Sequence, residues 1–208
     1  MAAALDTEGL VGPAAPSVAI VASFAESLRL FRWHLMRELA GRGYRVVAYA
    51  PDPEPGLMET LARIDVEVRP VPLARRSLNA FSDVNTLAHL VREFRMLRPE
   101  LVLSYTIKPI IYGSFAARLA GVKRIYSMFE GLGYAFEDGP EAPSRTRAAI
   151  RSLLRRAVRC NDGVVFLNED DLATFETREV VPAHLKRIVV PGTGIDLDYY
   201  DVRPLPDS

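Results

Sequence analysis

The chain has 208 residues, which suits one domain large enough to bury about 70% of the surface that its unfolded form exposes. Its 26 basic and 26 acidic residues cancel, so no overall field would draw the protein onto nucleic acid, and any anion site must be local. A single cysteine, Cys160, excludes an internal disulfide framework and favours a reducing, cytoplasmic compartment.

The beginning of the chain differs in composition from the rest. Residues 1–16 are rich in Ala, Gly and Pro without apolar periodicity, and we expect a flexible N-terminal tail there. These residues lack a basic segment followed by an apolar run, and no apolar run in the chain approaches the roughly 20 residues of a membrane span. The expected folded domain covers residues 17–200.

Apolar runs alternate with segments of helical periodicity along that domain. Residues 17–22 form a continuous apolar run typical of a parallel strand covered on both faces, and Leu28, Phe31, Leu35 and Leu39 then recur at helical spacing. Further strands are expected at residues 44–49, 66–71, 101–103, 124–127, 163–167 and 187–190, with helices near 55–64, 82–97, 110–120 and 145–159 and a short one before the last strand. Repeated βα units predict an α/β fold: a single Rossmann-like domain with a parallel sheet of about seven strands and helices on both faces.

Polar residues follow four of the expected strands, at the edge where open α/β sheets bind ligands. They are Ser23, Glu26, Ser27, Arg29 and Arg32 after the first strand, Arg75, Arg76 and Ser77 after the third, Ser104, Tyr105, Thr106 and Lys108 after the fourth, and Glu130 after the fifth. A solvated strand end remains the alternative for any one loop. Four loops together favour a binding site.

Glu130 is the candidate for catalysis. It lies in the loop after the strand expected at 124–127 and precedes Gly131, Gly133 and Tyr134, and glycines let backbone amides approach a ligand closely. The alternative is a glycine-containing turn with a solvated carboxylate.

A basic helix is expected at residues 145–159. Arginines that include Arg147, Arg151 and Arg155 occupy one broad face without an acidic residue, and apolar side chains occupy the other. Such a face suits an anionic membrane surface, and we predict that these three arginines face one. The alternative is an ordinary surface helix, which we favour for the apolar stripe.

Metal and cofactor sites are not expected. Cys160 has no clustered ligand, and His34, His89 and His184 lie far apart in the sequence. The first strand enters a loop without G-x-G-x-x-G, so the phosphate cradle of dinucleotide-binding domains is missing.

Five segments carry a resemblance to a known family. They are SLRLFRWHLMRELAGRGYRVVAYAP (27–51), VRPVPLARRSLNAFSD (68–83), YTIKPIIYGSFAARLAGVKRIYSMFEGLGYAF (105–136), VVFLNEDD (164–171) and VVPGTGIDLDYY (189–200). In this order they resemble the N-terminal domain of family 4 retaining glycosyltransferases of the GT-B fold. The chain is most similar to bacterial enzymes that add sugars to lipid-linked intermediates of surface polysaccharides or protein glycans.

The resemblance implies a division of labour between two domains. The N-terminal domain binds the acceptor, here a lipid-linked saccharide, and a C-terminal domain binds the nucleotide sugar. Residues 201–208 resemble the start of the interdomain linker, and the donor domain is absent from the chain, so we expect the isolated chain to fold without transferring sugar. The alternative is a non-catalytic subunit that binds lipid-linked sugars or tethers a separate donor-binding chain to the membrane. Either protein would be cytoplasmic and peripheral on the inner face of an anionic membrane, without a nucleic-acid partner.

The resemblance also implies roles for the polar residues. The expected acceptor-binding residues are Ser27, Arg29, Arg32, Arg75, Arg76, Tyr105, Thr106, Lys108, Gly131, Gly133 and Tyr134. Among them Lys108, Arg75 and Arg76 would meet the acceptor pyrophosphate. For the two arginines the alternative is a salt bridge to Asp83 or Glu93. Related proteins commonly carry Thr where Glu130 stands, which favours an orienting role for Glu130 over a general-base role.

Overall fold

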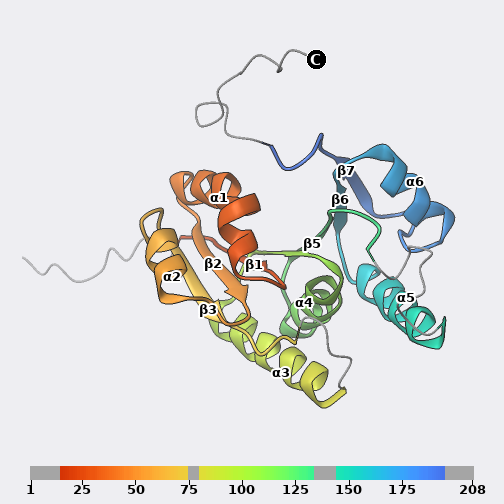
Figure 1. The fold of residues 1–208 in the computed structure, drawn as a ribbon, viewed down its shortest axis with the longest axis horizontal. Coiled ribbons are helices and arrows are strands. Elements are labelled where there is room, and N and C mark those ends of the chain that lie inside the picture. Colours follow the sequence, from red (N-terminus) through yellow and green to blue (C-terminus); the bar gives the residue numbers. More distant parts are fainter. Residues whose placement is uncertain (1–14, 75–79, 134–143, 195–208) are drawn as a thin grey trace, which may run out of the picture.

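The computed structural model describes residues 15–74, 80–133 and 144–194. Within these residues, seven parallel strands form one sheet in the order β3-β2-β1-β4-β5-β6-β7 (Figure 1). The strands are β1 (Ser17–Val21), β2 (Arg45–Ala50), β3 (Val66–Pro70), β4 (Leu101–Tyr105), β5 (Arg124–Phe129), β6 (Gly163–Phe166) and β7 (Lys186–Val189). The expected parallel sheet is confirmed.

Helices cover both faces of this sheet, as expected. They are α1 (Glu26–Gly41), α2 (Pro55–Ala62), α3 (Ala80–Leu97), α4 (Ile107–Ala120), α5 (Ser144–Val158) and α6 (Glu169–Thr177). Helices α1 and α2 share a hydrophobic core with one face of β1, β2 and β3. Helices α3, α4, α5 and α6 pack on the opposite face, with α4 between α3 and α5 (Figure 1). None of the helices in the described part of the chain is long and apolar enough to cross a membrane.

The parallel pairing of the central strands places the polar residues that follow them at one edge of the sheet. Strand β1 lies between β2 and β4, and Val21 is paired with Tyr49 on one side and Ser104 on the other. Every residue of β1 is buried, which is the reason for its continuous apolar run. Because all strands are parallel, their carboxyl ends lie at one edge of the sheet.

Helix α1 differs from the sequence expectation in the stripe that it buries. Phe31 is 48% exposed, whereas Leu28, Arg32 and Met36 are buried. These three residues are spaced four apart and lie on one face of a helix. The apolar pattern places Phe31 on the buried face and leaves out Arg32, because charged residues are expected at the surface. Arg32 can occupy the buried face because a carboxylate there neutralises it.

Strands β4 and β5 are longer than the sequence indicated. Strand β4 includes Ser104 and Tyr105, which we had expected in a loop, and the helix after it begins at Ile107 rather than near residue 110. Ser104 and Tyr105 are both buried, so their side chains pack between the sheet and the helices that cover it. Strand β5 continues to Phe129, whose ring stacks on Phe166 at 4.9 Å between centroids. Glu130 is therefore the first residue beyond a strand that is anchored in the core.

Candidate acceptor site at the carboxyl edge of the sheet

An ion pair joins α1 to the end of β5. Nη2 of Arg32 donates to Oε1 of Glu130, across 98 residues of sequence. The Arg32 side chain is 3% exposed and that of Glu130 is 24% exposed, so the carboxylate reaches solvent and the guanidinium does not. Nη1 of Arg32 also donates to the backbone oxygen of Phe31 at 2.8 Å. A fixed, buried cation therefore holds one oxygen of a carboxylate that a ligand can contact.

The ring of Tyr105 packs against the guanidinium of this ion pair. The guanidinium carbon of Arg32 lies 4.5 Å from the centroid of the Tyr105 ring, a favourable cation–π distance. The Tyr105 hydroxyl and Oγ of Ser27 are 2.8 Å apart, and Ser27 donates its single proton to the backbone oxygen of Phe24. It follows that Tyr105 donates to Ser27. Burial raises the pKa of Tyr105 to about 12, so the phenol stays protonated at neutral pH.

A second contact joins the ends of β1 and β4. Oγ1 of Thr106 donates to Oγ of Ser23 at 2.8 Å. Thr106 has a φ of 67°, an uncommon conformation for a β-branched residue, and it immediately precedes α4. The strained backbone turns the chain sharply from strand to helix, and it places two hydroxyl groups side by side at the middle of the edge.

The glycines after Glu130 have different roles. Gly131 has a φ of 151°, and a Cβ there would meet no atom of the described residues within 4 Å, so these residues leave space next to Glu130 in the chain. Gly133 has a φ of 65°, and a Cβ there would lie 2.8 Å from Cδ1 of Ile107, the first residue of α4. Gly133 therefore allows close packing of the β5 loop on α4, while Gly131 leaves room beside Glu130.

Lys108 lies in the first turn of α4 rather than in a loop, and its ammonium is engaged. Nζ donates to the backbone oxygen of Ala74 at 2.8 Å and to Oδ1 of Asp83 at 3.0 Å. Only 7% of the Lys108 side chain is exposed, so it is neither a solvated surface lysine nor an open phosphate contact. The contact instead ties the chain after β3 to the start of α4. Asp83 pairs with Lys108, and Glu93 pairs with Arg69. The alternative salt bridges of Arg75 and Arg76 to Asp83 or Glu93 fall on arginines outside the described residues.

The remaining predicted residues that the structure describes are not brought into this cluster. Arg29 is half exposed and bonds Glu26 one turn earlier on α1. Arg75, Arg76 and Tyr134 lie outside the described residues. On α5, the side chains of Arg147 and Arg151 are partly exposed, and Arg155 donates to the backbone oxygen of Arg178 at 2.8 Å. The apolar residues Ile150, Leu154 and Ala157 of α5 pack in the core, as the ordinary-helix alternative predicted.

Sequence reasoning missed two features of the site. One is the contact of Ser23 with Thr106, and the other is the contact of Asp83 with Lys108. An acidic residue in the first turn of α3 gave some signal, because such residues stabilise helix N-termini, but its partner comes from another helix. The site as a whole offers a partly exposed carboxylate and hydroxyl groups, which are hydrogen-bonding groups that can recognise a sugar. Among the described residues, no group of three or more His, Cys, Asp or Glu side chains is placed to hold a metal ion.

A parallel sheet in this order, with helices on both faces, resembles one Rossmann-like half of a GT-B glycosyltransferase. Two crystal structures share this fold at low sequence identity. HepE from Anabaena, solved with UDP and glucose, has a TM-score of 0.62 and 14% identity, over 90% of this chain and 47% of HepE. MurG from Acinetobacter baumannii has a TM-score of 0.55 and 14% identity, over 88% of this chain and 47% of MurG.

Sequence comparison makes the assignment more specific. A profile of the glycosyl transferase 4-like domain matches residues 29–192, and the chain belongs to that family. A curated relative, the N,N'-diacetylbacillosaminyl-diphospho-undecaprenol alpha-1,3-N-acetylgalactosaminyltransferase of Campylobacter jejuni, is 25% identical over 171 residues. That match covers 82% of this chain and 44% of the relative, so the chain spans less than half the length of the enzyme that it resembles.

Proposed function

We propose that this chain is the acceptor-binding lobe of a retaining glycosyltransferase that moves a sugar from a nucleotide sugar onto a lipid-linked saccharide. The observation that carries the proposal is the Arg32–Glu130 pair, which presents a carboxylate at the carboxyl edge of the sheet beside open space at Gly131. Support comes from the family and from the curated relative, whose name describes transfer to a diphospho-undecaprenol-linked sugar. A second lobe would bind the donor.

In this proposal Glu130 accepts a hydrogen bond from the hydroxyl that will be glycosylated. The new bond joins that oxygen to the anomeric carbon, the bond from that carbon to the departing diphosphate breaks, and the hydroxyl proton passes toward the departing phosphate. Arg32 holds one oxygen of Glu130 in place, which favours an orienting role for this carboxylate over proton abstraction. Thr106 and Ser23 would contact a neighbouring sugar hydroxyl, since they lie at the same edge.

The acceptor pyrophosphate requires separate cations. Lys108 is not part of the proposal, because Asp83 and Ala74 already engage its ammonium. Arg75 and Arg76 remain proposed contacts of the pyrophosphate, since they directly follow Ala74 in the chain. Transfer would take place at the cytoplasmic face of the membrane, where the protein is peripheral.

Binding of an acceptor analogue tests the proposal. The chain, in detergent micelles, would be titrated by calorimetry with a short-chain polyprenyl diphosphate that carries an N-acetylhexosamine. We expect saturable binding that Glu130→Gln weakens by roughly tenfold, the scale of one charge-assisted hydrogen bond. Glu38→Gln, at an exposed position of α1, is the matched control and should bind as the wild type does. Binding of a nucleotide sugar with no binding of the analogue would overturn the assignment to the acceptor lobe.

A further inference from the structure

Helix α3 exposes an apolar surface that the site does not use. Phe81 is 88% exposed, Val84 66% and Met96 55%, and Leu119 at the end of the neighbouring helix α4 is 59% exposed. Single exposed apolar residues are common on proteins, but a row of them along one helix marks a contact surface. The "α3 face" is defined here by the exposed residues Phe81, Val84, Ala88, Arg92, Arg95 and Met96, together with Leu119.

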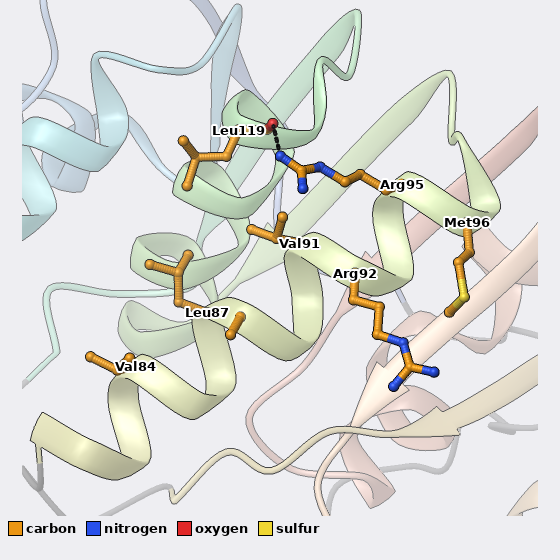
Figure 2. Close-up of a pocket in the computed structure, with 8 residues that line it drawn as sticks. Val84, Leu87, Val91, Arg92, Arg95, Met96 and Leu119 are labelled. Atoms are coloured by element: carbon orange, nitrogen blue, oxygen red, sulfur yellow. Dashed lines mark hydrogen bonds between the residues drawn. The ribbon is translucent and has the colours of Figure 1, made fainter.

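The α3 face includes a groove between α3 and α4. Figure 2 shows Leu87 and Val91 of α3 on the side of Leu119 of α4, with Val84 one turn further along α3. Nη2 of Arg95 lies 3.5 Å from the backbone oxygen of Leu119 and closes one end of the groove (Figure 2). Apolar side chains therefore line a groove that is open to solvent, and arginines lie at one end of this groove.

The charge on this surface has one sign. Arg92 and Arg95 belong to the α3 face. Arg98 and Arg118 are also exposed, and they lie at the C-terminal ends of α3 and α4. The two carboxylates of α3 point elsewhere, because Asp83 pairs with Lys108 and Glu93 pairs with Arg69. No exposed side chain that the structure describes on α3 is acidic. The surface is therefore apolar near the start of α3 and cationic near its end.

We propose that the α3 face docks the protein onto an anionic lipid bilayer. Phe81, Val84 and Met96 enter the headgroup region, and Arg92 and Arg95 contact anionic headgroups, as in amphipathic helices that lie in the membrane interface. Charge complementarity favours this occupant. A second copy of the chain would bring the same arginines without carboxylates on this face to neutralise them.

The docking places the candidate site at the membrane. The first turn of α3 holds Asp83, which pairs with Lys108 at the carboxyl edge of the sheet, so the apolar end of the α3 face lies at the site end of the helix. A lipid-linked acceptor would then reach Glu130 with its lipid still in the bilayer. This orientation rests on the proposed function, whereas the docking itself does not.

Vesicle flotation tests the docking. The chain would be mixed with vesicles of phosphatidylcholine alone, or of phosphatidylcholine with phosphatidylglycerol, neither containing a saccharide lipid. We expect binding to the anionic vesicles only. The pair Arg92→Gln and Arg95→Gln should lower the partition coefficient by roughly tenfold or more, because each interfacial cation contributes about a fivefold change. Val84→Asp should lower it by a similar factor, because it replaces an apolar contact by an anion that anionic headgroups repel.

Two controls separate this surface from others. Leu30→Asp alters a residue that is 54% exposed on α1, on the opposite face of the sheet, and should leave vesicle binding unchanged. Arg151→Glu on α5 tests the basic helix and should have a smaller effect than Val84→Asp. Circular dichroism would verify that each variant is folded, as expected for exposed positions.

Several results would overturn the proposal. One is equal binding to neutral and anionic vesicles, or loss of binding in Arg151→Glu but not in the α3 variants. Another is a concentration-dependent dimer that Val84→Asp dissociates, without vesicle binding, which would assign the α3 face to a second copy. Because the vesicles carry no acceptor and the calorimetric titration uses no bilayer, docking and acceptor binding can fail independently.

Discussion

Arg32 in α1 and Glu130 after β5 form an ion pair in which the cation is buried and the anion reaches solvent. The guanidinium rests on the ring of Tyr105 at the end of β4, so three separate elements meet at this pair. Such a pair costs desolvation of the arginine, and the carboxylate and the aromatic ring offset that cost.

We predict that Arg32→Met lowers the free energy of unfolding by about 2 kcal/mol. This is below the usual range for breaking a buried pair, because the orphaned carboxylate of Glu130 can still be hydrated. The double variant Arg32→Met with Glu130→Gln should lose less than the single variant, since no unpaired charge remains. Urea unfolding measures both, and Arg29→Ala, which breaks an exposed pair, should cost less than about 1 kcal/mol. A loss in Arg32→Met no larger than in Arg29→Ala would contradict the pair's structural role.

The Lys108–Asp83 pair should also stabilise the fold. Lys108→Met leaves Asp83 and the backbone oxygen of Ala74 without this donor, and we expect a loss of about 2–3 kcal/mol. Lys123→Met, at an exposed position before β5, is the matched control and should change stability by no more than about 0.5 kcal/mol. If Lys108→Met unfolds like the wild type but loses affinity for inorganic pyrophosphate, the lysine acts on the ligand instead.

Glu130→Gln should distinguish an orienting role from proton abstraction. In a two-lobe enzyme reconstituted with a donor-binding lobe, we expect the variant mainly to raise KM for the acceptor, because a ground-state hydrogen bond is weakened. General-base assistance would instead account for roughly 10²-fold or more in kcat. Steady-state kinetics with varied acceptor separates the two roles, and a large fall in kcat at unchanged KM would show that Glu130 takes the proton.

Tyr105 should make stability depend on pH in the alkaline range. Burial raises the pKa of Tyr105 to about 12 from the 10.0 of a free tyrosine. The unfolded chain loses this proton first, so the stabilisation is complete below pH 10 and declines as the pH rises toward 12, by up to about 1.4 kcal/mol per pH unit. Urea unfolding at pH 8 and at pH 11 should show a larger loss for the wild type than for Tyr105→Phe. Parallel pH dependence of the two proteins would mean that Tyr105 titrates normally.

Much of the architecture follows from local patterns. Continuous apolar runs identified the buried parallel strands, because each strand packs on both faces, and the alternation with helices implied a sheet with both faces covered. The position of Glu130 just beyond a strand could also be predicted, since apolar residues end there and glycines follow. The ends of β4 and β5 were placed too early, because Ser104, Tyr105 and Ser127 are polar residues that are buried within the sheet layer.

The sequence alone therefore determined the fold class, the strand order along the chain and the edge at which polar residues gather, because these depend on hydrophobic periodicity. Only the tertiary structure decided which charges are paired. Arg32 lies on a buried helix face because Glu130, 98 residues away, neutralises it, and Lys108 is withdrawn from solvent because Asp83 on another helix is its partner. The sequence does not distinguish a solvated charged side chain from a buried one. Its burial depends on which partner long-range packing places beside it.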